Sequence, residues 1–98
     1  MTKKLNPEEI ELYKKIAEVL FNMWDPIGIS HEVDVNDEYN EYVPKVFNLL
    51  IANEPKEFLI KYLSDVEFNR MGLTPDIRRI QLVVDVLLVH KKKILGFQ

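Results

Sequence analysis

Acidic side chains gather in one short stretch of the chain, at positions 25–41. The stretch has a local charge of −6 in 17 residues, because it contains no lysine or arginine. Its six carboxylates are those of Asp25, Glu32, Asp34, Asp37, Glu38 and Glu41. Carboxylate oxygens are the ligands that divalent cations prefer, but the calcium-loop spacing fails here. Counted from Asp34, Tyr39 takes the place of the required glycine and Lys45 that of the bidentate glutamate.

Two interpretations of the acidic stretch stay open. In the first, the stretch binds a divalent metal or a small ligand through His31, Asp34, Asp37 and Glu38. In the second, its charges are solvated and cap the start of a helix. One histidine among scattered carboxylates is a weak ligand set, since tight transition-metal sites usually gather three or four protein ligands. We therefore predict no bound metal and no cofactor.

Tyrosines flank the acidic stretch on its C-terminal side. If this part is helical, spacings of three and four residues place Glu38, Glu41 and Tyr42 on one exposed side. Tyrosine is enriched in protein interfaces, and an acidic field speeds the encounter with a basic partner. The pattern favours a non-enzymatic protein-binding module, whose partner is another protein or a second copy. The residues predicted to contact it are Asp34, Asp37, Glu38, Glu41 and Tyr42. The alternative is an ordinary exposed helix face.

The segment Trp24-Asp25-Pro26-Ile27-Gly28 predicts a structural corner. We expect Trp24 to bury its ring at the end of the first helix with its N–H satisfied. Asp25 can accept backbone N–H bonds in an Asx-type turn, and Pro26 and Gly28 direct the chain away from the helix. The alternative is that the aromatic ring and the carboxylate contact a ligand.

Composition excludes several classes of protein. The chain has 98 residues, one domain's worth, and a formal net charge of −3, which argues against a nucleic-acid-coating protein. Without cysteine there are no disulfides, thiolate metal sites or thiol catalysis. No apolar run approaches the length of a membrane span, and no leader pattern follows the N-terminus, so we expect a cytoplasmic protein. An enzyme that uses the acidic carboxylates is a further alternative, and no catalytic motif supports it.

Four segments have helical periodicity. The first runs from Pro7 to Trp24, with Asn6 as its N-cap. The second contains Pro44, so either it starts near Asn40 or two helices meet at a kink. The third follows Pro55 and ends at Gly72, where a left-handed C-cap is expected.

The fourth helical segment is expected over 74–93, with Thr74 as its N-cap. The sequence therefore predicts an all-α fold: a four-helix bundle-like single domain over residues 1–98. One long irregular loop is expected between the first and second helices.

Three of these motifs together resemble a known family. They are Trp24-Asp25-Pro26-Ile27-Gly28, the Asp37–Pro44 segment with its E-Y-x-x-Y-V-P pattern, and Met71-Gly72-Leu73. The chain is similar to the YugE-like family of small bacterial proteins of unknown function, best known in Bacillus. The resemblance implies a cytosolic helical bundle and supplies no activity, cofactor or catalytic residue.

Overall fold

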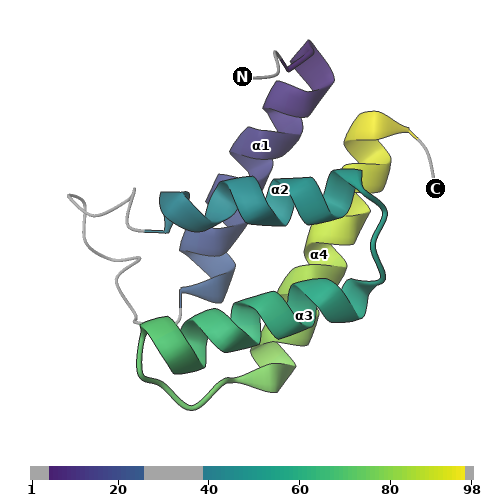
Figure 1. Ribbon diagram of the computed structural model, residues 1–98. Coiled ribbons are helices and arrows are strands. Elements are labelled where there is room, and N and C mark those ends of the chain that lie inside the picture. The colour runs from purple at the N-terminus through teal and green to yellow at the C-terminus, as the bar shows by residue number, and fades with distance from the viewer. Residues whose placement is uncertain (1–4, 26–38, 97–98) are drawn as a thin grey trace.

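The computed structural model describes residues 5–25 and 39–96, and these are helical throughout most of their length (Figure 1). The described residues form four α-helices, and three short helical turns adjoin these helices. The elements in chain order are α1 (Pro7–Val19), η1 (Leu20–Trp24), η2 (Asn40–Tyr42), α2 (Val43–Ile51), α3 (Lys56–Asp65), η3 (Val66–Arg70) and α4 (Ile77–Leu95). The described ranges contain no strand, so the predicted all-α class is confirmed. Within the same ranges, no helix is long and apolar enough to cross a bilayer.

The four α-helices form two layers. In Figure 1, α2 and α3 lie in front of α1 and α4 and run across them. Helix α4 packs against both α1 and α3, and α2 packs against both α1 and α3. The described helices thus form two crossed pairs, and an aligned four-helix bundle is not confirmed. The predicted irregular loop falls on positions 26–38, which lie outside the described residues.

One hydrophobic core joins the two layers. Each α-helix contributes at least one side chain with no exposed or almost no exposed surface. Its central members include Ile16 of α1, Val46 of α2, Leu63 of α3 and Val84 of α4. In α2, α3 and α4 most residues at the expected apolar spacing are buried, because a 3.6-residue period keeps one face of each helix directed to the core. In α1 the expected apolar spacing through Ile10 does not mark the buried face: Ile10 is 43% exposed, and Leu12 and Ile16 enter the core instead.

The start of α1 follows local sequence rules. The Asn6 side chain accepts from the backbone N–H of Glu9 at 2.8 Å, and the Glu9 carboxylate accepts from the backbone N–H of Asn6 at 3.0 Å. This reciprocal pair is a capping box, and Pro7 lies in the first turn, where a missing N–H costs nothing. The predicted N-cap is confirmed.

The open question at Pro44 has a clear answer. The short turn η2 runs into α2, and Pro44 lies in the first turn of α2. A proline there removes an N–H that has no intrahelical acceptor, so no kink is needed. The helical region thus begins at Asn40, as in the first alternative, but its first three residues form a separate 3₁₀ turn and α2 itself begins at Val43.

The connection from α3 to α4 differs in part from expectation. Gly72 has the predicted left-handed φ of 68°. The backbone N–H of Leu73 donates to the carbonyl of Glu67 at 2.8 Å, one residue further back than in a Schellman turn, because η3 is π-helical. The N-cap of α4 is Asp76, whose side chain accepts from the backbone N–H of Arg79, so the prediction of Thr74 is wrong.

Candidate functional site

The predicted site residues divide into two groups. Asp34, Asp37 and Glu38, together with Pro26, Gly28 and His31, lie outside the described residues. Glu41, Tyr42, Trp24 and Asp25 are described, and they lie where η1 and η2 contact each other through the rings of Trp24 and Tyr42. The described part of the site therefore consists of the residues that flank positions 26–38: Trp24 and Asp25 before them, and Glu41 and Tyr42 after them.

Tyr42 does not lie on an exposed side, and that expectation is wrong. Its side chain is only 5% exposed, whereas Glu41 beside it is exposed. The reason is the type of turn: η2 is a 3₁₀ turn, in which residues three apart share a face. Tyr39 and Tyr42 therefore point inward together, and Tyr42 offers little surface to a partner.

The two tyrosines pack on Trp24, which has no exposed surface. The ring centroid of Trp24 lies 5.4 Å from that of Tyr39 and 5.7 Å from that of Tyr42, the latter edge to face. Such offset and edge-on contacts stabilise aromatic pairs beyond the area they bury. The predicted burial of Trp24 is confirmed, and the ring also holds η2 against the end of the first helix.

Asp25 and Tyr39 are joined by a hydrogen bond. The Tyr39 hydroxyl donates to Asp25 Oδ1 at 2.8 Å. Asp25 itself has a left-handed φ of 32°, a conformation that aspartate tolerates better than most residues. Asp25 here accepts from a side chain; the predicted Asx-type turn involves backbone N–H groups of the following positions, which lie outside the described residues. Because residues 25 and 39 bracket positions 26–38, the bond ties the two ends of the acidic stretch together.

A buried carboxylate that sequence reasoning missed completes the corner. Glu67 is 2% exposed, and its two oxygens accept from Trp24 Nε1 at 2.7 Å and from the backbone N–H of Asp76 at 2.9 Å. The predicted satisfaction of the Trp24 N–H is thus confirmed, and its partner is now known. One signal was available: Glu67 follows Leu59 and Leu63 at four-residue spacing, which places it on the buried face.

Charged groups surround the outer side of the tyrosines. The guanidinium of Arg70 lies 5.6 Å from the centre of the Tyr42 ring, a cation–π distance. Burial raises the pKa of Tyr42, and the hydrogen bond and charge of Glu41 raise it further, against the opposing effect of Arg70. Burial also raises the pKa of Tyr62, with Arg70 again opposing. Both hydroxyls therefore stay protonated near neutral pH and act as neutral polar groups.

The carboxylates of Asp25 and Glu67 accept hydrogen bonds from protein donors. Glu67 has both oxygens occupied by protein donors, and no group of three or more histidine, aspartate or glutamate side chains gathers within residues 5–25 and 39–96. The arrangement can hold the ends of a segment in place, and it provides neither a nucleophile–base pair nor a cation site in the described part of the chain.

Comparisons with known proteins supply no relative. No family model, no curated protein and no solved structure matches the chain.

Proposed function

We propose that this protein is a non-enzymatic interaction module that binds a basic protein through its acidic stretch, positions 25–41. The observation that carries the proposal is the hydrogen bond between the Tyr39 hydroxyl and Asp25, which holds the two ends of that stretch together. Asp34, Asp37 and Glu38 are the proposed contact residues, and the exposed Glu41 extends the acidic surface at its edge. Tyr42 supports the stretch from the core.

Two physical effects favour binding by a stretch anchored in this way. A segment with fixed ends has less conformational freedom to lose when a partner binds, and this raises its affinity. A local charge of −6 attracts a basic surface and speeds its encounter. An enzyme is a weaker proposal, because the buried carboxylate of the corner is already occupied by two protein donors.

The proposal includes a cellular location and a class of partner. We place the protein in the cytoplasm of a bacterium, in keeping with its resemblance to the YugE-like family, and we expect a protein partner or a second copy and no nucleic acid. The net charge of −3 supports the last point, since phosphate binding needs a cationic surface.

Affinity capture with matched charge variants tests the proposal. Asp34→Lys/Glu38→Lys reverses two charges in the acidic stretch, and Glu8→Lys/Glu11→Lys reverses two exposed charges on α1. Both variants have the same net charge, so a general electrostatic effect changes both equally. We expect a protein captured by the wild type to be lost with the first variant and kept with the second, and to be released by salt. The same proteins captured by both variants would contradict the proposal.

The metal alternative, centred on His31, Asp34, Asp37 and Glu38, has a separate readout. A cation that binds only the folded chain, at 100 times its Kd, adds about 2.7 kcal/mol to the free energy of unfolding. Thermal melts with calcium, magnesium, manganese and zinc would reveal this as a raised midpoint that Asp34→Lys/Glu38→Lys abolishes. Such a result would replace the interaction proposal with the metal one.

A further inference from the structure

The outer face of α4 has a strip of apolar side chains that faces solvent. Leu82 is 57% exposed and Val89 is 52% exposed, and Val86 between them is partly buried. These three residues follow the i, i+4, i+7 spacing of one helix face, so they form a line about 10 Å long. We call them the α4 strip.

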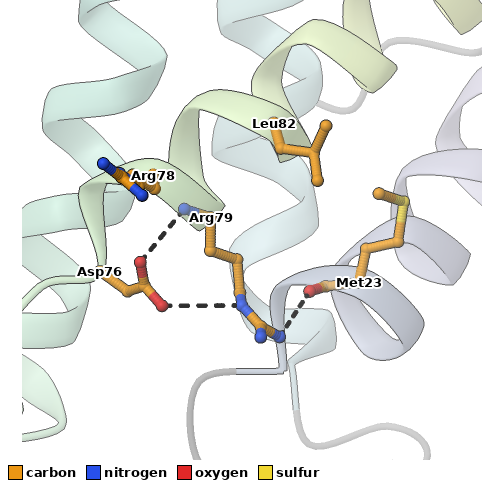
Figure 2. Close-up of a pocket in the computed structure, with 5 residues that line it drawn as sticks. All are labelled: Met23, Asp76, Arg78, Arg79 and Leu82. Atoms are coloured by element: carbon orange, nitrogen blue, oxygen red, sulfur yellow. Dashed lines mark hydrogen bonds and ion pairs between the residues drawn. The ribbon is translucent and has the colours of Figure 1, made fainter.

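A hollow continues the α4 strip toward η1. It has a volume of ≈ 540 Å³, and Figure 2 shows Met23 and Leu82 on its two sides. Arg79 holds the hollow's walls together: its Nη1 donates to the carbonyl of Met23 at 3.3 Å, and its Nε lies 3.7 Å from Asp76 Oδ2 (Figure 2). The apolar surface is thus contributed by two elements that are tied to each other.

Basic side chains flank the α4 strip at both ends. Arg78 lies at its N-terminal end, and Lys92 and Lys93 lie at its C-terminal end; all three are exposed. In the part of the chain that the structure describes, no carboxylate forms an ion pair with any of them. Their charges are therefore available to a partner with acidic side chains.

The charge pattern argues against a second copy as the occupant. If two α4 strips packed antiparallel, with Leu82 opposite Val89 of the other copy, Arg78 would meet the other copy's Lys93. If they packed parallel, each basic residue would meet its own equivalent. Like charges in close apposition disfavour an interface, so the strip is unsuited to its own pairing.

A lipid surface is also disfavoured. The strip has no aromatic side chain, and such residues are typical of helices that lie in the membrane interface. Two carboxylates lie on the same face: Asp76 lines the hollow, and Asp85 lies one helical turn from Leu82 and from Val89. Each of them lies near a basic side chain, Asp76 near Arg79 and Asp85 at 3.8 Å from Lys56 Nζ, so among the described residues the unpaired charges along the strip are those of its basic flanks.

We infer that the α4 strip binds an acidic amphipathic helix of another protein. Aliphatic side chains of that helix pack on Leu82, Val86 and Val89, and one enters the hollow beside Met23. Its carboxylates pair with Arg78, Lys92 and Lys93. This is the helix-on-groove mode of recognition, in which apolar anchors at i, i+3 or i+4, and i+7 supply the contact area and charges set the orientation. The strip shares no residue with the acidic stretch, and its flanking charges are opposite to it in sign.

A designed peptide is the probe. It is a fluorescein-labelled helix of about 18 residues, long enough to be helical in water, with leucines on one face and glutamates on the others. Fluorescence anisotropy measures its binding to the full chain. We expect saturable binding, and binding about tenfold weaker or worse for a scrambled peptide of the same composition.

Two pairs of variants assign the binding to the α4 strip. Leu82→Ala/Val89→Ala removes two exposed apolar side chains of the strip, and Ile10→Ala/Phe68→Ala removes two exposed ones elsewhere. Arg78→Glu/Lys93→Glu reverses two flanking charges, and Lys14→Glu/Lys45→Glu reverses two exposed charges elsewhere. The strip variants should lose about tenfold or more in affinity, and the matched controls should bind like the wild type. Far-ultraviolet circular dichroism verifies that each variant is folded.

Several outcomes would overturn the inference. One is the absence of peptide binding up to about 1 mM, the weakest affinity of interest. A second is equal binding by the scrambled peptide or equal loss in the control variants. A third is a chain that dimerises by itself and becomes monomeric with Leu82→Ala/Val89→Ala, which would assign the strip to a second copy. A fourth is sedimentation with phosphatidylserine vesicles that the same variant abolishes, without peptide binding.

Discussion

The indole N–H of Trp24 donates to the carboxylate of Glu67 across 2.7 Å, although the two residues are 43 positions apart in the chain. Both side chains are buried, and both end a helix in a π-helical turn, Trp24 in η1 and Glu67 in η3. The second oxygen of Glu67 accepts from the backbone N–H of Asp76, which precedes α4. One carboxylate therefore fixes the end of the first helix, the end of the third and the start of the fourth.

Glu67→Gln is expected to destabilise the protein although it preserves the shape of the side chain. Glutamine has one acceptor oxygen, and two donors converge at this position, so its NH₂ group must face an N–H. The loss of a buried, charge-assisted hydrogen bond costs about 1–3 kcal/mol. Urea unfolding, followed by the fluorescence of the single buried tryptophan, measures the change.

Glu57→Gln is the matched control for this prediction. Glu57 lies in α3, is exposed, and forms no side-chain hydrogen bond within the described residues. Exposed substitutions of this kind change the free energy of unfolding by less than about 0.5 kcal/mol. Equal effects of the two substitutions would mean that the Glu67 bonds contribute nothing specific.

Tyr39→Phe is expected to loosen the ends of the acidic stretch. The substitution keeps the ring on Trp24 and removes the hydroxyl that donates to Asp25. We expect a loss of about 0.5–1.5 kcal/mol in the free energy of unfolding. Amide hydrogen exchange should become faster at residues 25 and 39–41, because local opening no longer breaks this bond.

Tyr13→Phe is the control, since Tyr13 packs its ring on Phe47 at 5.4 Å and that contact survives the substitution. Faster exchange at residues 25 and 39–41 in both variants, or in neither, would contradict the anchoring role of the Tyr39 hydroxyl.

Two substitutions of Asn53 separate the contributions of its backbone conformation and of its side chain to the free energy of unfolding. It has a left-handed φ of 59°, and its Oδ1 accepts from Nζ of Lys91, a buried lysine of α4 whose pKa is lowered by burial. Asn53→Gly removes the acceptor and suits the backbone, and it should cost about 1 kcal/mol. Asn53→Ala also adds a strained left-handed residue, so it should cost about 1 kcal/mol more. Thermal or urea unfolding ranks the three proteins, and an alanine variant as stable as the glycine variant would exclude the backbone effect.

The raised pKa values of Tyr42 and Tyr62 predict a loss of stability in alkali. As pH rises past 10.0, the ordinary tyrosine value, the unfolded chain loses these protons before the folded one does. The stabilising contribution is therefore complete below pH 10.0 and is lost as pH rises through the raised values. Lys91 has the opposite effect on stability. Because burial lowers its pKa in the folded chain, the unfolded chain holds this proton more tightly, and the contribution of Lys91 to stability increases as pH rises toward its ordinary pKa of 10.5.

Comparison with Tyr42→Phe/Tyr62→Phe isolates the tyrosines, because Lys91 contributes equally to both proteins. Tyrosinate absorbance should show a late-ionising fraction in the wild type that is missing in the variant. The stability advantage of the wild type over the variant should shrink between about pH 9 and about pH 11. A wild type whose tyrosines all ionise together near 10.0 would contradict the prediction.

Local signals in the sequence determine much of the fold. The capping pattern at Asn6, the tolerance for Pro44 in a first turn and the need for glycine at position 72 all depend on residues within one or two turns. Apolar spacing likewise identified the buried face of α2 and most of the buried faces of α3 and α4, because the period is a property of the helix itself. In α1 it favoured the side of Ile10 over that of Leu12 and Ile16, which form the core. The sequence by itself therefore determined the all-α class and the approximate bounds of the helices.

Only the tertiary structure decided which polar groups meet. Spacing alone places Glu67 on the buried face of its helix, but only the fold supplies its two donors, Trp24 and the backbone N–H of Asp76. The N-cap of α4 is Asp76, not Thr74. Tyr42 faces the core because η2 is a 3₁₀ turn that packs on Trp24. The physical reason is common to these cases: the free energy of a buried polar group depends on partners that are distant in the chain, and no local pattern encodes them.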